Sequence, residues 1–236
     1  MNMTADDLKR YLTHVIAVME ENKDYLSELD RKLGDGDHGV TMSIGWQAIG
    51  EQLRGALKDE QDCAKICTVA GRTFLSAVGS SVGPLYAMGF LRGAKVIQNV
   101  AVLRDEELVR FWVAFMEGIK ERGKADIGDK TMIDTLGPAL TVLQIRYRTT
   151  GEFRAAFSDA VAAGRRGMEA TKDMLSRKGR SSRLGERSLG IQDPGATSAF
   201  LILRAFLDTI NAQVESQAAI PIREGVCTID NECGTQ

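Results

Sequence analysis

Residues 29–39 read LDRKLGDGDHG, an acidic, glycine-rich turn that follows a long helical pattern near the N-terminus. Three carboxylates, Asp30, Asp35 and Asp37, alternate there with glycines that allow the backbone to fold tightly. Mg²⁺ prefers oxygen ligands and shares its coordination between a few carboxylates and substrate phosphates. The turn therefore predicts a site for one or two magnesium ions. In the alternative interpretation, Asp30 caps a helix end and the other two acids lie in a solvated turn.

Two better-known motifs overlap this turn, and neither fits. The glycines Gly34, Gly36 and Gly39 match the dinucleotide-binding pattern, but they follow a helix instead of a strand. That pattern would also place two aspartates where a pyrophosphate lies. A calcium loop that starts at Asp35 needs a carboxylate at its twelfth position, where the chain has Trp46.

Composition indicates an ordinary globular protein. The chain has 236 residues, of which 44% are hydrophobic, which suits one or at most two domains with a sizeable core. Thirty basic and 32 acidic side chains give a net charge of −2, so we expect neither nucleic-acid nor membrane-surface binding. No apolar stretch is long enough to cross a membrane, and no leader pattern precedes the first helix. We therefore expect a cytoplasmic protein with reduced thiols.

Apolar periodicity predicts an all-α fold of eight helices. They span about residues 4–29, 40–57, 63–78, 84–99, 105–119, 128–148, 152–176 and 196–214. Thr4 and Asp7 form a capping-box signature, and Asp193 with Pro194 marks the start of the last helix. We expect one domain over residues 1–214 and a polar, partly disordered tail over residues 215–236.

Two segments between these helices have the character of phosphate-binding loops. The break GSSVGP at residues 79–84 places small residues before a helix whose first position suits Pro84. Residues 177–192, here called the lid segment, carry five basic side chains opposed only by Glu186. Arginine forks fit polyphosphate geometry, so we predict a structureless loop that orders over a bound nucleotide. A solvated basic face is the alternative.

Four motifs occur in one characteristic order and spacing: LDRKLGDGDHG, GSSVGPLY, RGKADIGDKTMID and KGRSSRLGERSLGIQDPGATS. In this respect the chain resembles the nucleotide-binding L subunit or domain of dihydroxyacetone kinases over about residues 5–212. The resemblance implies an antiparallel barrel of eight helices with ADP or ATP at one end. It also implies two Mg²⁺ ions held by Asp30, Asp35 and Asp37.

The resemblance further implies a set of nucleotide contacts. They fall on His38, Gly39, Val40, Thr41, Ser81, Val82, Gly123, Met132, Arg180, Asp193, Pro194 and Gly195. Two positions depart from the family pattern, which often has serine at Val82 and histidine at Ile191. The loss of a hydroxyl at Val82 removes one phosphate contact, whereas neither departure touches the metal ligands.

The expected function is that of a phosphoryl-donor subunit for a short-chain ketose kinase. In the family, the ketose is bound covalently to a histidine of a separate K-type subunit. This chain has only His14 and His38, and no nucleophile or general base is apparent in it. The sequence leaves open whether ATP or a phosphocarrier protein supplies the phosphate, and whether the ketose is dihydroxyacetone or a tetrulose.

Two other functions stay open at this point. One is the nucleotide domain of a fatty-acid kinase, whose acidic turn is similar but usually has threonine at the position of His38. The other is a docking or regulatory module that retains its nucleotide permanently.

Overall fold

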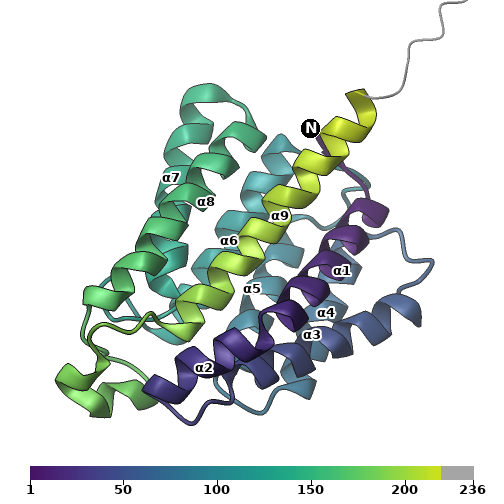
Figure 1. Cartoon of the computed structure of the whole chain (residues 1–236). Helices are drawn as coiled ribbons and strands as arrows, with labels where there is room; N and C mark the ends of the chain where they lie inside the picture. Colours follow the sequence, from purple (N-terminus) through teal and green to yellow (C-terminus); the bar gives the residue numbers. More distant parts are fainter. Residues whose placement is uncertain (219–236) are drawn as a thin grey trace, which may run out of the picture.

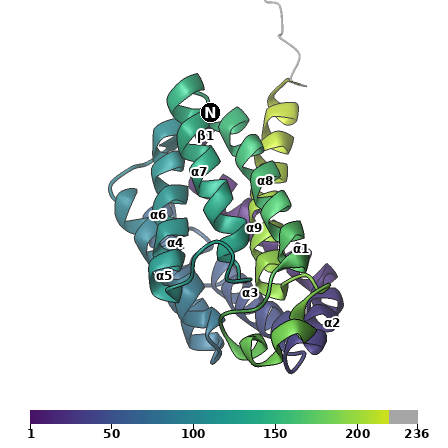
Figure 2. The ribbon, with the colours of Figure 1, turned by 90° about the vertical axis from the view of Figure 1, so that its left-hand side faces the viewer.

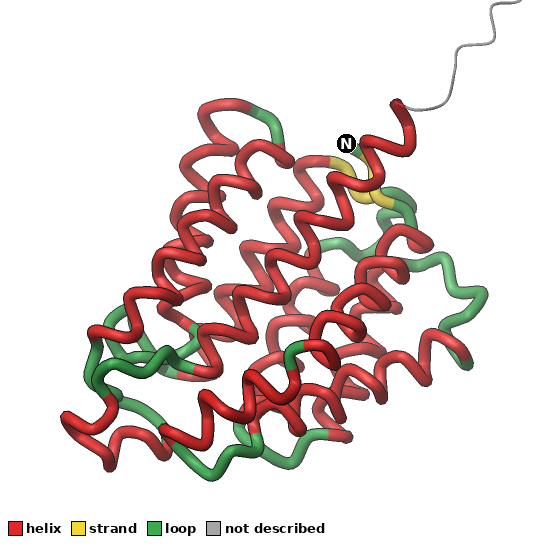
Figure 3. The backbone as a smooth tube through the Cα atoms, viewed as in Figure 1, coloured by secondary structure: helices red, strands yellow, loops and turns green. Residues whose placement is uncertain are grey.

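The computed structural model of the protein describes residues 1–218. Within this range, almost all regular structure is helical (Figures 1 and 3). The α-helices are α1 (Ala5–Glu21), α2 (Lys23–Leu33), α3 (His38–Arg54), α4 (Cys63–Ala77), α5 (Val82–Val96), α6 (Asp105–Gly123), α7 (Ile133–Thr150), α8 (Phe153–Ala170) and α9 (Pro194–Ala218). Two 3₁₀ helices, η1 (Thr171–Asp173) and η2 (Arg180–Ser188), precede α9.

The helices form a closed antiparallel ring, visible in the two views of Figures 1 and 2. Each helix from α3 to α9 packs on its successor, and α1 and α2 both lie between α3 and α9. Helices α1 and α2 therefore share one position, and the ring has eight helical positions. This arrangement confirms the all-α fold predicted from apolar periodicity.

The first predicted helix, over residues 4–29, is in fact two helices separated at Asn22. The Asn22 side-chain amide donates a hydrogen bond to the carbonyl of Val18 at 2.8 Å, and the Asn22 backbone amide donates to the same carbonyl at 3.1 Å. Asparagine competes in this way with regular helical bonding. The second helix then continues to Leu33, so Asp30 lies in its last turn and not beyond its end.

Other helix boundaries also differ from the prediction. Helix α3 starts at His38 instead of residue 40, and α5 starts at Val82, which makes Pro84 the third helical residue instead of the first. Proline is tolerated there because the first-turn amides have no partner within the helix. Helix α9 continues to Ala218, so the predicted tail is helical over residues 215–218. The rest of that tail lies outside the described residues.

Aromatic side chains fill the interior of the ring. Trp112 contacts Phe206 edge to face with ring centroids 4.9 Å apart, and Tyr11 contacts the same ring at 4.9 Å. Trp46 lies near Phe74 in a second group between α3 and α4. Such pairs contribute about 0.5–1.5 kcal/mol each beyond the burial of their area. The core is therefore well specified along the length of the ring.

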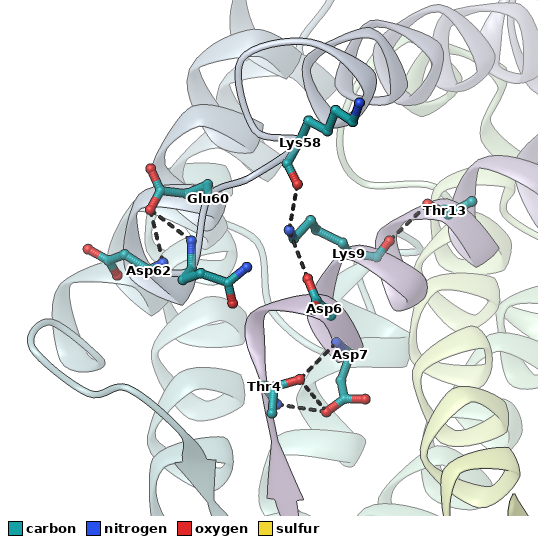
Figure 4. A network of polar contacts seen from close by, with 9 residues as sticks. Thr4, Asp6, Asp7, Lys9, Thr13, Lys58, Glu60 and Asp62 are labelled. Atoms are coloured by element: carbon teal, nitrogen blue, oxygen red, sulfur yellow. Dashed lines mark hydrogen bonds and ion pairs between the residues drawn. The ribbon is translucent and has the colours of Figure 1, made fainter.

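Polar contacts close the end of the ring that carries the N-terminus (Figure 4). The Thr4 hydroxyl accepts from the Asp7 amide while the Asp7 carboxylate accepts from the Thr4 amide, as the capping-box signature predicts. Lys9 pairs with Asp6 and donates to the carbonyl of Lys58 at 2.9 Å. These contacts tie α1 to the connection between α3 and α4.

A short antiparallel ribbon lies at the same end, with strand β1 (Asn2–Met3) paired to β2 (Leu103–Arg104). This ribbon was not predicted from the sequence, because two residues are too few to show an alternating pattern. None of the helices in residues 1–218 is long and apolar enough to span a bilayer.

Candidate nucleotide and metal site

The three aspartates of the acidic turn converge at the opposite end of the ring, next to the C-terminus of α2. One carboxylate oxygen from each of Asp30, Asp35 and Asp37 lies within 4.8 Å of the others. A turn with a positive φ of 80° at Gly36 brings them together. Such closely spaced negative charges repel one another, and their oxygen-only donor set is the one that Mg²⁺ prefers. The residues present therefore fit a magnesium centre.

A cavity of about 430 Å³ opens beside these carboxylates. Its wall includes the first turns of four helices, α3, α5, α7 and α9, at His38, Val82, Ile133 and Pro194. The antiparallel ring brings these N-termini together, since every second helix begins at this end. Helix N-termini carry partial positive charge and free amides, so this end of the ring favours a bound anion.

His38 fixes the start of α3 against α9. Its ring Nε2 lies 2.9 Å from the Ser198 hydroxyl, and its backbone amide donates to the Asp30 carboxylate at 3.2 Å. Burial lowers the pKa of His38 to about 4, although the nearby Asp30 opposes that shift. The imidazole is therefore neutral near pH 7, and it acts through hydrogen bonds and not as a phosphate-binding cation.

Asp193 caps α9 at the base of the cavity. Its carboxylate accepts from the Ala196 amide at 2.7 Å, and its own amide donates to the Thr171 hydroxyl at 3.0 Å. Burial raises the pKa of Asp193 to about 7; the Ala196 amide opposes this, and the nearby Asp134 adds to it. A carboxyl with this pKa changes charge near neutral pH at the cavity wall.

The loop between α4 and α5 contains an unsatisfied buried hydroxyl at the wall of the same cavity. The Ser80 Oγ is buried and has no hydrogen-bond partner among the described residues, and Ser80 lines the cavity beside Ser81. Buried polar groups in native proteins are nearly always paired. The orphaned hydroxyl therefore fits a bound polar group, such as a phosphate oxygen.

The lid segment covers one side of the cavity. Lys178 to Ser181 line it, and the Arg180 guanidinium pairs with the Asp35 carboxylate. In Figure 1 the η2 helix of this segment lies beside α2, at the lower end of the molecule. The segment contains η2, with a break at Gly185, so the prediction of a structureless loop was wrong. The two ends of the lid segment are held by hydrogen bonds to residues far away in sequence, and such contacts leave no local sequence pattern.

Most residues named from the resemblance line this cavity, but two do not. The lining set comprises Asp30, Asp35, Asp37, His38, Thr41, Ser81, Val82, Gly123, Met132, Arg180, Asp193, Pro194 and Gly195. Gly39 packs instead against α2, where an added Cβ would lie 1.9 Å from the Lys23 carbonyl oxygen. The Val40 side chain is exposed on α3.

Several polar residues of the cavity wall were not predicted from the sequence, among them Ser80, Lys130 and Thr131. Ser80 lies within the quoted loop GSSVGP, and the other two lie within the quoted segment RGKADIGDKTMID. Their position inside these motifs was the available signal, but nothing local distinguishes them from ordinary turn residues.

Comparisons of this chain with a family model and with curated proteins agree with one another. A family model described as the DAK2 domain matches residues 32–208. The ADP-binding subunit DhaL of PEP-dependent dihydroxyacetone kinase 2 from Listeria innocua is 35% identical over 200 residues, which cover 84% of this chain and 91% of that protein. The ADP-binding subunit DhaL of the Escherichia coli PEP-dependent enzyme is 36% identical, with 86% and 96% covered.

A solved structure shares the fold. The dihydroxyacetone kinase of C. freundii superposes with a TM-score of 0.66 and 26% identity over 85% of this chain. The match spans only 34% of that longer kinase, which has also been solved with AMP-PNP and Mg²⁺.

Proposed function

The chain belongs to the DAK2 domain family, and on that premise we propose that it is the nucleotide-binding, phosphoryl-donor subunit of a short-chain ketose kinase of the dihydroxyacetone type. The observation that carries the proposal is the cluster of Asp30, Asp35 and Asp37 beside a cavity that four helix N-termini surround. Phosphoryl transfer requires mainly positioning and charge neutralisation, and this end of the ring is suited to both.

In this proposal the three aspartates would hold two Mg²⁺ ions, which would neutralise the charge of a bound nucleoside diphosphate or triphosphate. The chain's own groups then orient the phosphates: the amides at the start of α3 and α5, the Ser80 hydroxyl and the Arg180 guanidinium. Met132 and Gly123 line the wall on the side assigned to the adenine. Arg180 contacts Asp35 already, so it lies within reach of phosphate bound at the metal ligands.

The acceptor ketose belongs on a separate K-type subunit. Among residues 1–218, His14 and His38 are both engaged in hydrogen bonds with α9, to Thr209 and Ser198 respectively. Neither is therefore placed to bind a carbonyl substrate. The proposed complex works in the cytoplasm, where nucleotide and Mg²⁺ are supplied and the buried Cys63 and Cys67 stay reduced.

We favour ADP as a retained cofactor that a phosphocarrier protein recharges. The two relatives described above, which the match covers over 91% and 96% of their length, are both named ADP-binding subunits of PEP-dependent kinases. Exchange kinetics separate the two donors: retention of ADP over many turnovers supports recharging, whereas rapid exchange for ATP supports a direct kinase.

The test is a single-turnover transfer. The chain is loaded with Mg²⁺ and ATP labelled in the γ-phosphate, freed of excess nucleotide, and mixed with dihydroxyacetone and a K-type subunit. We expect labelled ketose phosphate in an amount close to that of the loaded chain. Label that stays on the nucleotide or appears only as inorganic phosphate would count against a donor role.

A further inference from the structure

A buried lysine, Lys130, lies in the cavity wall, and the proposed chemistry gives it no part. Its side chain is only 1% exposed, and its backbone has a positive φ of 59°. Few non-glycine residues adopt that conformation, and they do so where surrounding contacts hold them. The burial of this charged side chain and its positive φ must both be explained by the surrounding contacts.

The reason lies in what the ammonium group touches. The Lys130 Nζ donates to the carbonyl oxygen of Met174 at 3.2 Å and to that of Ser188 at 2.5 Å. These carbonyls flank the exposed part of the lid segment, 44 and 58 residues away in sequence. The Lys130 ammonium group therefore links the segment that leads into the lid to the segment that leads out of it.

We define the stem of the lid as residues 172–176 and 188–190, and its tip as residues 177–187. Two further bonds close the stem: the Ser176 amide donates to the Ser188 hydroxyl at 3.0 Å, and the Gly190 amide donates to the Lys172 carbonyl at 2.7 Å. Ser176 and Ser188 are buried, whereas the tip is exposed or partly exposed throughout. The stem therefore helps to position the tip over the cavity, together with the ion pair between Arg180 and Asp35.

Lys130 itself projects from a loop that is held rigidly. The fully buried Asp134 accepts from the amides of Gly128 and Thr131 at 2.6 and 2.7 Å. The neighbouring Asp129 carbonyl accepts from the Arg177 amide at 3.1 Å, which adds a second link between this loop and the lid. The same loop leads directly into Met132 on the cavity wall.

Charge supports the role. An ammonium group offers three donors but no acceptor, so it can join several carbonyls at once, and burial strengthens such bonds. Burial also lowers the pKa of Lys130, while the carboxylates of Asp193 and Asp173 oppose that shift. The cation therefore has negative partners nearby on both the stem and the cavity base.

We propose that Lys130 is a positioning residue that clamps the stem of the lid, holds Arg180 over the phosphate end of the cavity, and so slows release of bound nucleotide. The clamp itself follows from the contacts above. Its effect on nucleotide release rests on the proposed function, and the two parts are tested separately.

The first test uses trypsin on the nucleotide-free chain and follows cleavage after Arg180, Arg183 and Arg187. Lys130→Asn and Lys130→Gly remove the ammonium but tolerate the positive φ. We expect cleavage in the tip to become about tenfold faster, as for a lost hydrogen bond to a charged group. Lys130→Arg, which keeps a cation, should restore much of the protection.

Two controls separate a clamp from general destabilisation. Lys124→Asn is the matched control, because Lys124 also has a positive φ, of 47°, but is exposed at the end of α6. It should leave cleavage of the tip unchanged. Cleavage after Arg148, at the far end of α7, should stay slow in every variant. Equal rates in Lys130→Asn and the unmodified chain, or faster cleavage at all sites, would overturn the clamp.

Hydrogen exchange on the unmodified chain gives an independent check if the variants fold poorly. The amides of Ser176 and Gly190 should exchange at least about tenfold more slowly than those of the tip. Equally fast exchange in the stem and the tip would contradict the proposal.

The second test measures dissociation of Mg²⁺-ADP by displacement with excess unlabelled nucleotide. Lys130→Asn should release ADP about tenfold faster, and Lys130→Arg should approach the unmodified rate. A clamp that loosens without any change in release would overturn the functional part alone. If the unmodified chain binds no Mg²⁺-nucleotide, the proposed function fails, but the tryptic result still decides the clamp.

Discussion

At the residue scale, the site combines side chains that a short stretch specifies with side chains that only the fold brings together. Asp30, Asp35 and Asp37 are predictable, because one stretch of eight residues carries all three. Lys130 and Asp193 owe their surroundings to partners far away in sequence. Burial, which shifts the pKa of both, is a property of the assembled ring and leaves no local pattern.

Asp37 provides the first prediction. Asp37→Asn removes one ligand charge, but the Asp37 side chain makes no capping bond to α3. The free energy of unfolding should therefore change by less than about 1 kcal/mol, because relief of repulsion offsets any loss. The affinity for ADP in Mg²⁺ should fall at least about tenfold, measured by isothermal titration.

Two controls accompany this variant. Asp59→Asn, a change of the same charge in an exposed turn between α3 and α4, should bind ADP normally. The unmodified chain in EDTA should bind ADP as poorly as Asp37→Asn does. Unchanged affinity in EDTA would show that nucleotide reaches the site without a metal.

Asp193 predicts a dependence of stability on pH. Its pKa of about 7 in the folded chain lies above the ordinary value of 3.8, because the carboxyl is buried. Between about pH 4 and pH 7, the folded chain retains a proton that the unfolded chain has released, so this group's contribution to stability falls as the pH rises.

Asp193→Asn keeps an oxygen for the Ala196 amide but cannot titrate. In EDTA and without nucleotide, its stability relative to the unmodified chain should rise by up to about 4 kcal/mol from pH 4 to pH 7. Urea unfolding at several pH values measures the difference. The comparison is needed because His38, whose pKa is lowered to about 4, gives the opposite slope in both proteins. Parallel curves for the two proteins would contradict the raised pKa.

At the scale of elements, periodicity located the helices well but misplaced their ends. The late end of α2 and the early start of α3 border the acidic turn, whereas the break at Asn22 lies at the other end of α2. Contacts between α2 and α3 determine these limits, since Gly39 fits closely against Lys23. The 3₁₀ helix in the lid segment was missed because its sequence is polar and its ends are fixed by remote residues.

Close packing between α7 and α8 leads to a further prediction. A Cβ added at Gly167 would lie 1.9 Å from the carbonyl oxygen of Asp134, a backbone atom that cannot move aside freely. Gly167→Ala should therefore lower the free energy of unfolding by at least about 2 kcal/mol, measured with urea. Gly79→Ala is the matched control, because an added Cβ there meets nothing within 4 Å. Equal stability of the two variants would show that the helices separate easily.

The lid segment should respond to nucleotide. Its basic side chains gain partners when phosphate charge arrives, so tryptic cleavage after Arg180 and Arg183 should slow at least about tenfold in saturating Mg²⁺-ADP. Cleavage after Arg148, distant from the cavity, provides the reference rate. Identical protection at both places would indicate overall stabilisation by the ligand and not a lid.

At the scale of the whole molecule, ring closure explains why the site lies at one end. Helices α1 and α2 join α3 to α9, so the first and last helices of the ring are neighbours. Because neighbouring positions in the ring are antiparallel, every second helix starts at the same end, and the N-termini of α3, α5, α7 and α9 lie together there. The sequence predicted eight helical positions, but neither the division of the first nor its contact with α9 could be derived from periodicity. The proposal that this chain forms only half of an active site, with the ketose on a separate K-type subunit, likewise concerns the whole molecule.

The last prediction concerns that half-site. The isolated chain should bind Mg²⁺-nucleotide but should phosphorylate free dihydroxyacetone or erythrulose at a negligible rate. In-line transfer needs an acceptor oxygen held in place, and such orientation is worth about 7–11 kcal/mol of barrier. Among residues 1–218, the proposed metal ligands and phosphate contacts lie in the cavity wall, and both histidines are engaged in hydrogen bonds with α9, so no group is free to bind a carbonyl substrate covalently through a histidine. A coupled assay with each ketose, with and without a K-type subunit, measures the difference, and Asp37→Asn with the same subunit serves as the inactive control. We expect turnover only when the unmodified chain and the subunit are combined. Sustained turnover by the chain alone would mean that it binds its own acceptor, and the half-site proposal would fail.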